Sequence, residues 1–189
     1  MSYVFAAQAR GIHPDDIYES LPFTSGLAYD AYVIDPGDSS GNYYTTQMYQ
    51  GEFNHQHTIT RKGHMGETAI AMSGNFNNKI YIGGTIGFPT IRFRQEKNHT
   101  ETALSDPLEI EHFTYNEYLT TRGNGINAKL GIIVLPTKWL RIGAAYHTPT
   151  KFYYMKDNWS SSMSSKFNDG TTYTAESVDG SFLYKLKTP

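Results

Sequence analysis

The chain has 189 residues, a formal net charge of −2 and a hydrophobic fraction of 39%. It carries no basic cluster longer than two residues, which excludes the phosphate-tracking surface of a nucleic-acid-binding protein. Its longest apolar run is far shorter than the roughly 20 residues of a membrane-spanning helix. Cysteine is absent, so disulfides, thiolate metal sites and cysteine nucleophiles are excluded together.

Residues 1–52 are predicted to form an irregular N-terminal part with one or two strands. Residues 2–9 favour a short strand, and residues 11–25 favour a loop or a short helix, because prolines suit its start and its stop. Residues 27–34 are rich in β-forming side chains and precede a dense cluster of turn residues, so they are predicted to form a strand.

Residues 53–189 are predicted to form an antiparallel meander. The 15 tyrosines, 10 phenylalanines and 17 glycines favour strands and turns over helices. Alternating apolar residues predict strands over residues 68–76 and 80–88. The tight turn between them falls at 77–78, where asparagine tolerates a positive φ. A further strand is predicted over residues 52–61.

Pro89 marks a change in this alternation. Before it, the apolar residues of the strand occupy even-numbered positions, whereas Ile91 and Phe93 occupy odd-numbered ones. A one-residue shift at a proline is typical of a β-bulge, so Pro89 is predicted to kink the strand. Arg92 and Arg94 would then point away from the apolar face.

Residues 125–150 show the clearest strand pattern, with two alternating segments around a short turn at 136–138. Lys129, Arg141 and His147 lie on the face opposite the apolar residues. The apolar face carries Ile126, Ala128, Leu130, Ile132, Val134, Leu140, Ile142, Ala144 and Tyr146.

The connections at 95–123 and 155–180 are, in contrast, predicted to be long loops, although residues 112–121 are strand-like and residues 171–186 are predicted to hold a last strand region. Short turns at one end of a sheet and long loops at the other are the layout of an outer-membrane barrel. A soluble β-sandwich also mixes loop lengths, but less regularly by end.

Several segments resemble the OmpP1/FadL family of outer-membrane channels, in the form found in Bacteroidetes-type bacteria. The segments that carry the resemblance are residues 75–83, 123–132, 136–138, 140–150 and 182–189, whose order and spacing fit the family. The resemblance implies an all-β fold, an antiparallel transmembrane β-barrel in the outer membrane of a Gram-negative bacterium. This chain, with about seven or eight strands, would be an internal and partial portion of that barrel.

The function that the resemblance implies is passive uptake of hydrophobic compounds such as long-chain fatty acids, without an enzymatic step or a cofactor. The intact barrel would be monomeric and surrounded by outer-membrane lipid. Pro89 is the candidate kink through which the wall opens. The arginines and the lysine among the candidate residues would attract a carboxylate headgroup. The candidate lumen-facing or ligand-facing residues are Arg92, Arg94, Lys129, Arg141 and His147. The alternative is a soluble periplasmic β-sandwich that binds a ligand or partner through its loops.

On a strand, the rings of His55 and His57 would point to the same face, as a metal site requires. His64 is nearby in the sequence. No carboxylate stands at a clear companion spacing, so solvated histidines are favoured and no metal site is predicted. The sequence also lacks a nucleophile elbow, a phosphate loop and a dinucleotide fingerprint, so no catalytic residue is predicted.

Overall fold

The computed structural model describes residues 1–46, 48, 52–104 and 109–188. Most of the described residues belong to antiparallel β-sheet, which confirms the predicted all-β class. The chain divides into two compact units. Unit 1 comprises Met1–Arg61, Gln95–Leu119 and Asn158–Gly180, and unit 2 comprises Lys62–Arg94, Thr120–Asp157 and Ser181–Pro189.

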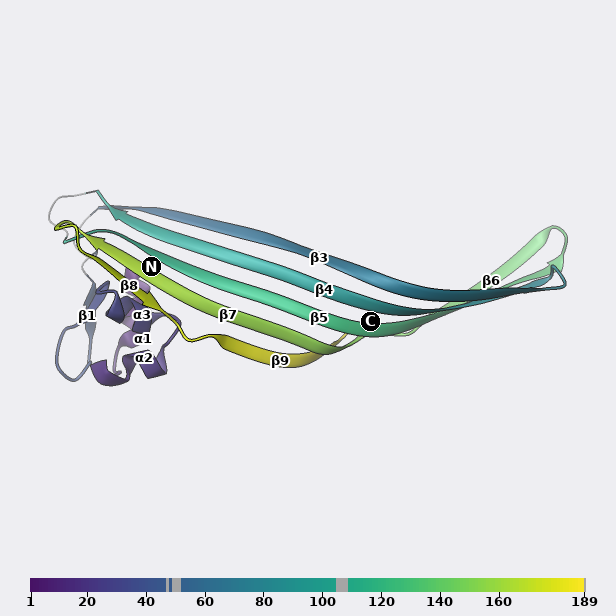
Figure 1. Cartoon of the computed structure of the whole chain (residues 1–189), viewed down its shortest axis with the longest axis horizontal. Coiled ribbons are helices and arrows are strands. Elements are labelled where there is room, and N and C mark those ends of the chain that lie inside the picture. The colour runs from purple at the N-terminus through teal and green to yellow at the C-terminus, as the bar shows by residue number, and fades with distance from the viewer. Residues whose placement is uncertain (47, 49–51, 105–108, 189) are drawn as a thin grey trace. The chain divides into compact units, whose positions relative to one another are not determined.

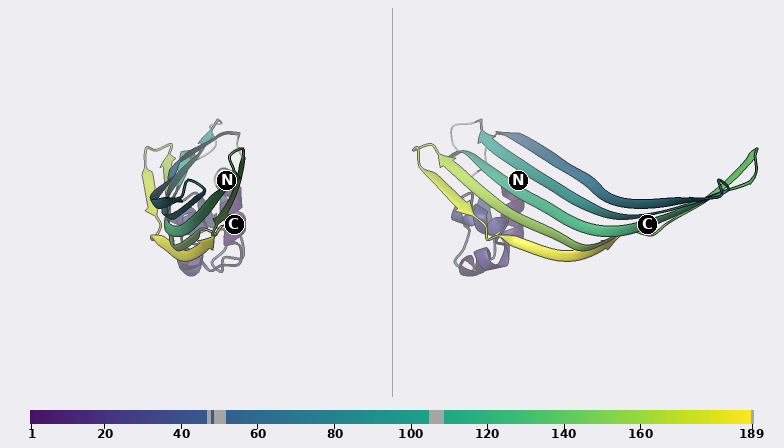
Figure 2. Two further views of the ribbon diagram at one scale, coloured as in Figure 1. Left: turned by 90° about the vertical axis from the view of Figure 1, so that its right-hand side faces the viewer. Right: turned by 45° about the vertical axis from the view of Figure 1, so that its right-hand side comes forward.

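A seven-stranded sheet contributes strands to both units. Its members are β3 (Phe53–Phe76), β4 (Ile80–Ala103), β5 (Ile110–Thr137), β6 (Leu140–His147), β7 (Lys151–Phe167), β8 (Thr172–Glu176) and β9 (Gly180–Lys187). The strand order is β3-β4-β5-β7-β8, with β6 paired to β5 and β9 paired to β7. Figures 1 and 2 show β4 between β3 and β5. Among the described residues, these strands do not close into a barrel.

The N-terminal part is more helical than predicted. It holds α1 (Ser2–Ala9), the short 3-10 helix η1 (Pro14–Asp16), α2 (Ile17–Ser20), α3 (Ser25–Asp30) and the two short paired strands β1 (Ile34–Pro36) and β2 (Tyr44–Thr46). The helix start at Pro14 confirms the short helix predicted within residues 11–25, whereas the two strands, apart from Ile34, lie at positions where none was predicted. The strands predicted over 2–9 and 27–34 are wrong, apart from the single position Ile34.

Tertiary packing explains why these two segments are helical. Phe5 and Ala9 stand four residues apart and are both buried, which is the spacing of one helix face. Ser25, at the start of α3, donates a hydrogen bond of 2.8 Å to the carbonyl oxygen of Phe5. Over only eight residues, apolar composition alone does not distinguish a strand from a buried helix.

The core of unit 1 lies between these helices and the sheet. Figure 1 shows the three α-helices grouped beside β8. Phe113 and Met163, from β5 and β7, are completely buried, and the ring of Tyr115 packs edge-on against Phe5 at 5.2 Å between centroids. The Tyr115 hydroxyl donates to the carbonyl oxygen of Phe23 at 2.7 Å. One face of the sheet in unit 1 therefore has a conventional protein core against it.

The long loops predicted at 95–123 and 155–180 are mostly strand. β4 continues to Ala103, β5 begins at Ile110, and β7 continues to Phe167, while residues 105–108 lie outside the described part. Polar residues of β4 pair with polar residues of β5, as in Asn98 with Asn116 at 2.7 Å and Thr100 with Thr114 at 3.1 Å. Such cross-strand pairs stabilise a strand that has no apolar alternation. The contrast in loop length that favoured a barrel is thereby removed.

The two short turns of unit 2 are close to their predicted places. Asn77 and Asn78 both have positive φ, and the amide of Lys79 donates to the carbonyl oxygen of Phe76, which confirms a two-residue hairpin turn. The turn predicted at 136–138 falls slightly later, because Thr137 pairs directly with Leu140. In the described part of the chain, none of the helices has the length and apolarity needed to cross a membrane.

Candidate functional site

Strand pairing in unit 2 places the alternating apolar residues on one face of the sheet. On β5 and β6, Leu130 is paired with Tyr146 and Val134 with Ile142, and directly paired residues share a face. A Cβ added to Gly84 of β4 would lie 3.2 Å from Leu130 Cδ2, so β4 presents its even-numbered residues on the same side. Because this alternation continues from strand to strand, the apolar stripe of the sequence becomes a continuous surface.

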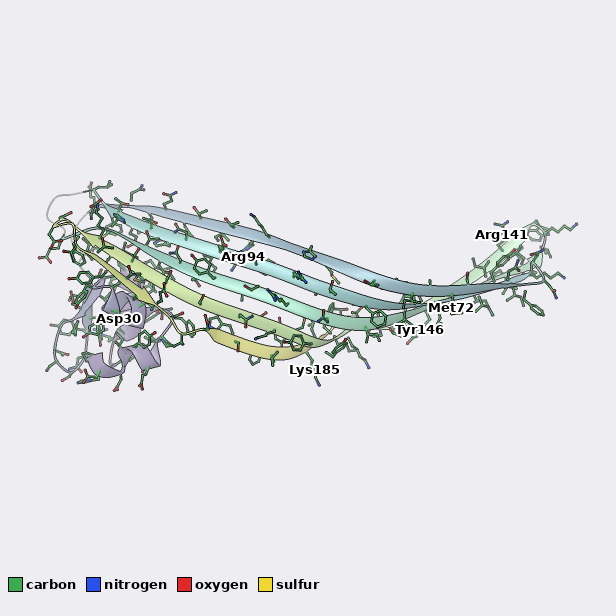
Figure 3. The ribbon with its side chains drawn as sticks, in the orientation of Figure 1. Asp30, Met72, Arg94, Arg141, Tyr146 and Lys185 are labelled. Carbon is green, nitrogen blue, oxygen red and sulfur yellow. The ribbon has the colours of Figure 1, made fainter. Side chains whose placement is uncertain are left out.

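We call this surface the apolar face. Its large side chains are Ile70, Met72, Ile82, Ile86, Ile126, Leu130, Ile132, Ile142 and Tyr146, and all of them are exposed. Met72 has 82% of its surface accessible and Leu130 has 60%. Figure 3 labels Met72 and Tyr146 on their strands. Contiguous apolar exposure over four strands marks a surface that contacts lipid or another protein.

The opposite side of the same strands, which we call the polar face, carries charged and small residues. The Lys129 ammonium lies 2.9 and 3.1 Å from the two carboxylate oxygens of Glu67. A Cβ at Gly87 would lie only 1.8 Å from Glu67 Oε1 and 2.5 Å from Asn127 Oδ1, so glycine makes room for both side chains. Asn127 donates to Thr150 at 3.2 Å, and its Oδ1 is buried without a hydrogen-bond partner among the described residues.

Three of the predicted lumen-facing residues share this polar face. His147 is the register partner of Lys129, and Arg141 lies on the same side of β6 by alternation. Lys129 is neutralised by Glu67, whereas Arg141 has no ion-pair partner among the described residues. Whether any of the three contacts a ligand stays a prediction.

Arg92 and Arg94 lie on the apolar side of the sheet, unlike their prediction. Phe93 faces the position of Gly63, and Gly63 is on the same side of β3 as Glu67. The two arginines flank Phe93 and so point to the other side. Along β4 the apolar residues therefore move from one face of the sheet to the other, while successive side chains continue to point to alternate faces.

The register shift predicted at Pro89 is absent from the pairing of β3 with β4. Before the proline, Ser73 of β3 lies beside Gly83 of β4, and after it Gly63 of β3 lies beside Phe93 of β4. Both pairs belong to one register, so no residue is inserted between them. Pro89 is completely buried inside continuous β4. Its role as an opening kink remains a prediction that no contact described here tests.

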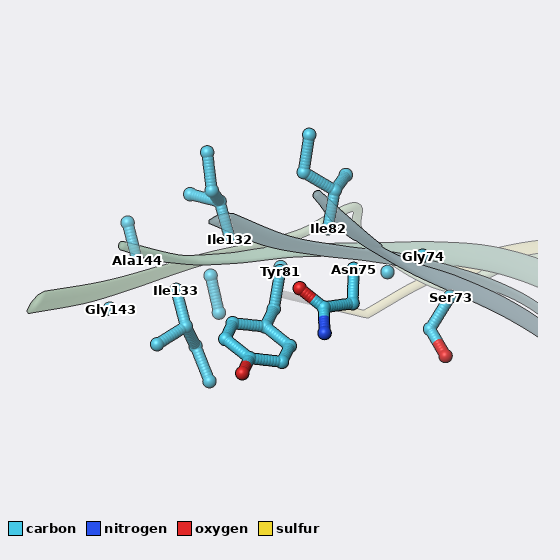
Figure 4. Close-up of a pocket in the computed structure, with 12 residues that line it drawn as sticks. Ser73, Gly74, Asn75, Tyr81, Ile82, Ile132, Ile133, Gly143 and Ala144 are labelled. Carbon is cyan, nitrogen blue, oxygen red and sulfur yellow. The ribbon is translucent and has the colours of Figure 1, made fainter. Parts of the chain in front are cut away.

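Two hollows occur on the unit 2 sheet. The first measures about 690 Å³, and Figure 4 shows Ile82 and Ile132 pointing to one side of its strands while Tyr81 and Ile133 point to the other. Because its lining belongs to both faces, it is not an enclosed ligand chamber. The second measures about 630 Å³, and its lining includes Ile86, Ile126 and Tyr146 of the apolar face together with Lys151 and Lys187.

The histidines form a group that the sequence did not predict. In unit 1, His55 Nδ1 and His99 Nε2 each lie 3.0 Å from Glu101 Oε1, and the His57 ring lies 5.6 Å from the His99 ring. His64 belongs to unit 2, apart from this group. Glu101 stands on β4, opposite His55 of β3, so the carboxylate missing from the local spacing comes from the neighbouring strand. Treating 95–103 as a strand with His99 and Glu101 on one face would have found it.

Glu101 is completely buried and accepts several hydrogen bonds. The amino group of Met1 and the histidines contact Oε1, and the Ser2 hydroxyl donates to Oε2 at 2.9 Å. Burial raises the pKa of Glu101, but the hydrogen bonds from Met1, His99 and Ser2 together outweigh it and hold the pKa below its usual value. The hydrogen bonds to this buried carboxylate therefore favour its charged form.

The fold and these surfaces define an antiparallel β protein with a cored unit and a unit whose sheet has one exposed apolar face. No protein-family model matches the chain, and no curated protein matches it significantly.

Proposed function

We propose that this chain is part of a β-barrel in the outer membrane of a Gram-negative bacterium. The observation that carries the proposal is the apolar face of unit 2, with the ion pair of Lys129 and Glu67 on the opposite side. Transmembrane barrel strands alternate in this way, with apolar residues outward and polar residues inward. A water-soluble sheet would bury such a face against a second layer.

The extent of the apolar face supports the same proposal. On β5 it runs from Ile126 to Val134, and a tilted strand needs about 9–11 residues to cross the hydrocarbon layer. The lysines Lys151 and Lys187 border a hollow on this face, where their ammonium groups would reach lipid headgroups. Closure of the barrel would need further strands, because lipid does not tolerate an unpaired sheet edge.

Within such a barrel, we propose passive passage of hydrophobic compounds such as long-chain fatty acids, as the resemblance to the OmpP1/FadL family implies. The polar face is only partly polar, because Ile133 and several glycines share it with Lys129 and Arg141. That mixture suits an amphiphile with an apolar tail and an anionic head. Arg141, without an ion-pair partner among the described residues, is the cation available to the head.

Uptake assays in the source bacterium test the transport proposal. Deleting the gene should lower uptake of a labelled long-chain fatty acid, and the wild-type gene should restore it. Complementation with Arg141→Gln should restore uptake of an uncharged alkane but leave fatty-acid uptake several-fold lower. Unchanged uptake of every hydrophobic compound tried after deletion would refute transport, whereas purification of the chain as a soluble monomer without detergent would favour a periplasmic sandwich.

A further inference from the structure

The side chains of His55, His99 and Glu101 converge at one point of unit 1. One ligand atom from each lies within 4.8 Å of the other two. The two histidines come from neighbouring strands, since His55 belongs to β3 and His99 to β4. Two imidazole nitrogens and one carboxylate are the ligands that bind zinc in many three-residue sites.

We propose that these three residues bind a divalent transition-metal ion, with Zn²⁺ as the best fit. Nitrogen and oxygen ligands together favour Zn²⁺ over Ca²⁺ or Mg²⁺, which prefer oxygen ligands alone. This site is separate from the apolar face and does not depend on the transport proposal.

The two distances that involve Glu101 are close to those around a bound ion. Zinc–nitrogen bonds of about 2.0–2.1 Å place two ligands of a tetrahedral ion roughly 3.3 Å apart. Each ring nitrogen is already 3.0 Å from Glu101 Oε1. The His55 side chain is 48% exposed, which leaves a path for the ion.

The surroundings of the group hold its ligands in place. The Ser2 hydroxyl donates to Glu101 Oε2, the oxygen that does not contact the histidines, and this fixes the orientation of the carboxylate. The His55 ring packs edge-on against Phe53 at 4.7 Å, and the His99 ring packs against buried Phe113 at 6.4 Å. The Met1 amino group contacts Glu101 Oε1, the oxygen that faces the histidines. A bound ion would replace the amino group at this oxygen.

Charge also favours a cation at this point. Glu101 is fully buried, and its carboxylate faces both histidines. A buried anion attracts a cation more strongly than a solvated one does. Neutral imidazoles add ligand atoms without adding positive charge.

Metal binding by the untagged full chain in detergent tests the proposal. After removal of metal with a chelator, the wild type should take up about one Co²⁺ or Zn²⁺ per chain, with Co²⁺ giving the intense visible absorption of a four-coordinate site. His55→Ala and His99→Ala should each weaken binding by roughly tenfold or more. His57→Ala is the matched control, because this histidine neighbours the group without joining it, and its affinity should stay within about twofold of wild type.

The His55→Ala variant tests the site in a folded chain, because His55 is half exposed and outside the core. No bound metal in the wild type would overturn the proposal. Equal affinities in the wild type, His55→Ala and His99→Ala would overturn it as well. Equal losses in His57→Ala and His99→Ala would assign any bound ion to loose surface histidines, and the proposed site would be wrong.

Discussion

Replacing Leu130 with arginine should destabilise the proposed barrel by about 2–4 kcal/mol, because a cation on the lipid-facing side of a barrel strand loses its hydration. Leu130 lies near the middle of the apolar face on β5 and is 60% exposed. Folding of the intact barrel that contains this chain into phospholipid vesicles, followed by denaturant titration, measures the loss.

Ile133→Arg supplies the matched control for Leu130→Arg. Ile133 lies on the same strand, is 48% exposed and points to the polar face. Its replacement should cost much less, since the arginine would meet water or polar groups. In a water-soluble sheet both positions are surface sites, and both changes would stay within about 0.5 kcal/mol of wild type. Equal small effects would therefore contradict a lipid-facing apolar face.

Phe113→Ala should destabilise the chain by about 3–5 kcal/mol, the usual cost of removing a buried aromatic side chain and leaving a cavity. Phe113 is completely buried in the core of unit 1, together with residues of the N-terminal helices. Denaturant unfolding followed by tyrosine and tryptophan fluorescence measures the change.

Tyr118→Ala on the same strand is the comparison for Phe113→Ala. Tyr118 is 41% exposed, so its loss should cost under about 1 kcal/mol. A similar loss of stability for both variants would mean that the contacts of Phe113 with the helical core add nothing to the stability of β5. A negligible loss for Phe113→Ala would mean that the N-terminal helices do not pack on the sheet.

The sequence predicted unit 2 better than unit 1, and the difference has a physical cause. In unit 2 each strand has one apolar and one polar face, so the alternation of residues such as Leu130 and Lys129 follows directly from the pleat. The turn at Asn77 and Asn78 was predicted because asparagine tolerates the required backbone conformation.

Unit 1 is determined by contacts between residues distant in the sequence. The strand around Asn98 is stabilised by its partner Asn116, and a polar strand without such a partner has the composition of a loop. α1 is helical because Phe5 and Ala9 pack into a core that forms only with β5 and β7. The carboxylate beside His55 comes from a strand more than forty residues later, so local spacing did not include it.

Pro89 shows how a sequence pattern has two physical explanations. A change of apolar positions from even to odd numbers arises either from an inserted residue or from a change in which face is apolar. The contacts of Gly63 and Gly83 show the same register of β3 with β4 on both sides of the proline. This favours a change in which face is apolar over an inserted residue. Arg92 and Arg94 were assigned to the polar face on the first explanation, and their placement was wrong for that reason.

Contact between the apolar face and lipid can be measured directly, because the chain has no cysteine. Single cysteines can therefore be introduced one at a time along residues 126–134. Each would carry an environment-sensitive fluorophore, and the intact barrel that contains the labelled chain would be reconstituted into vesicles. Lipid-borne and water-soluble quenchers then report what surrounds each position.

A lipid-facing apolar face predicts a two-residue period in this experiment. Labels at 126, 130, 132 and 134 should be quenched from the lipid, and labels at 127, 129, 131 and 133 should be quenched from water or remain protected from both quenchers. Quenching from water at every position, or no difference between odd and even positions, would contradict the lipid-facing apolar face.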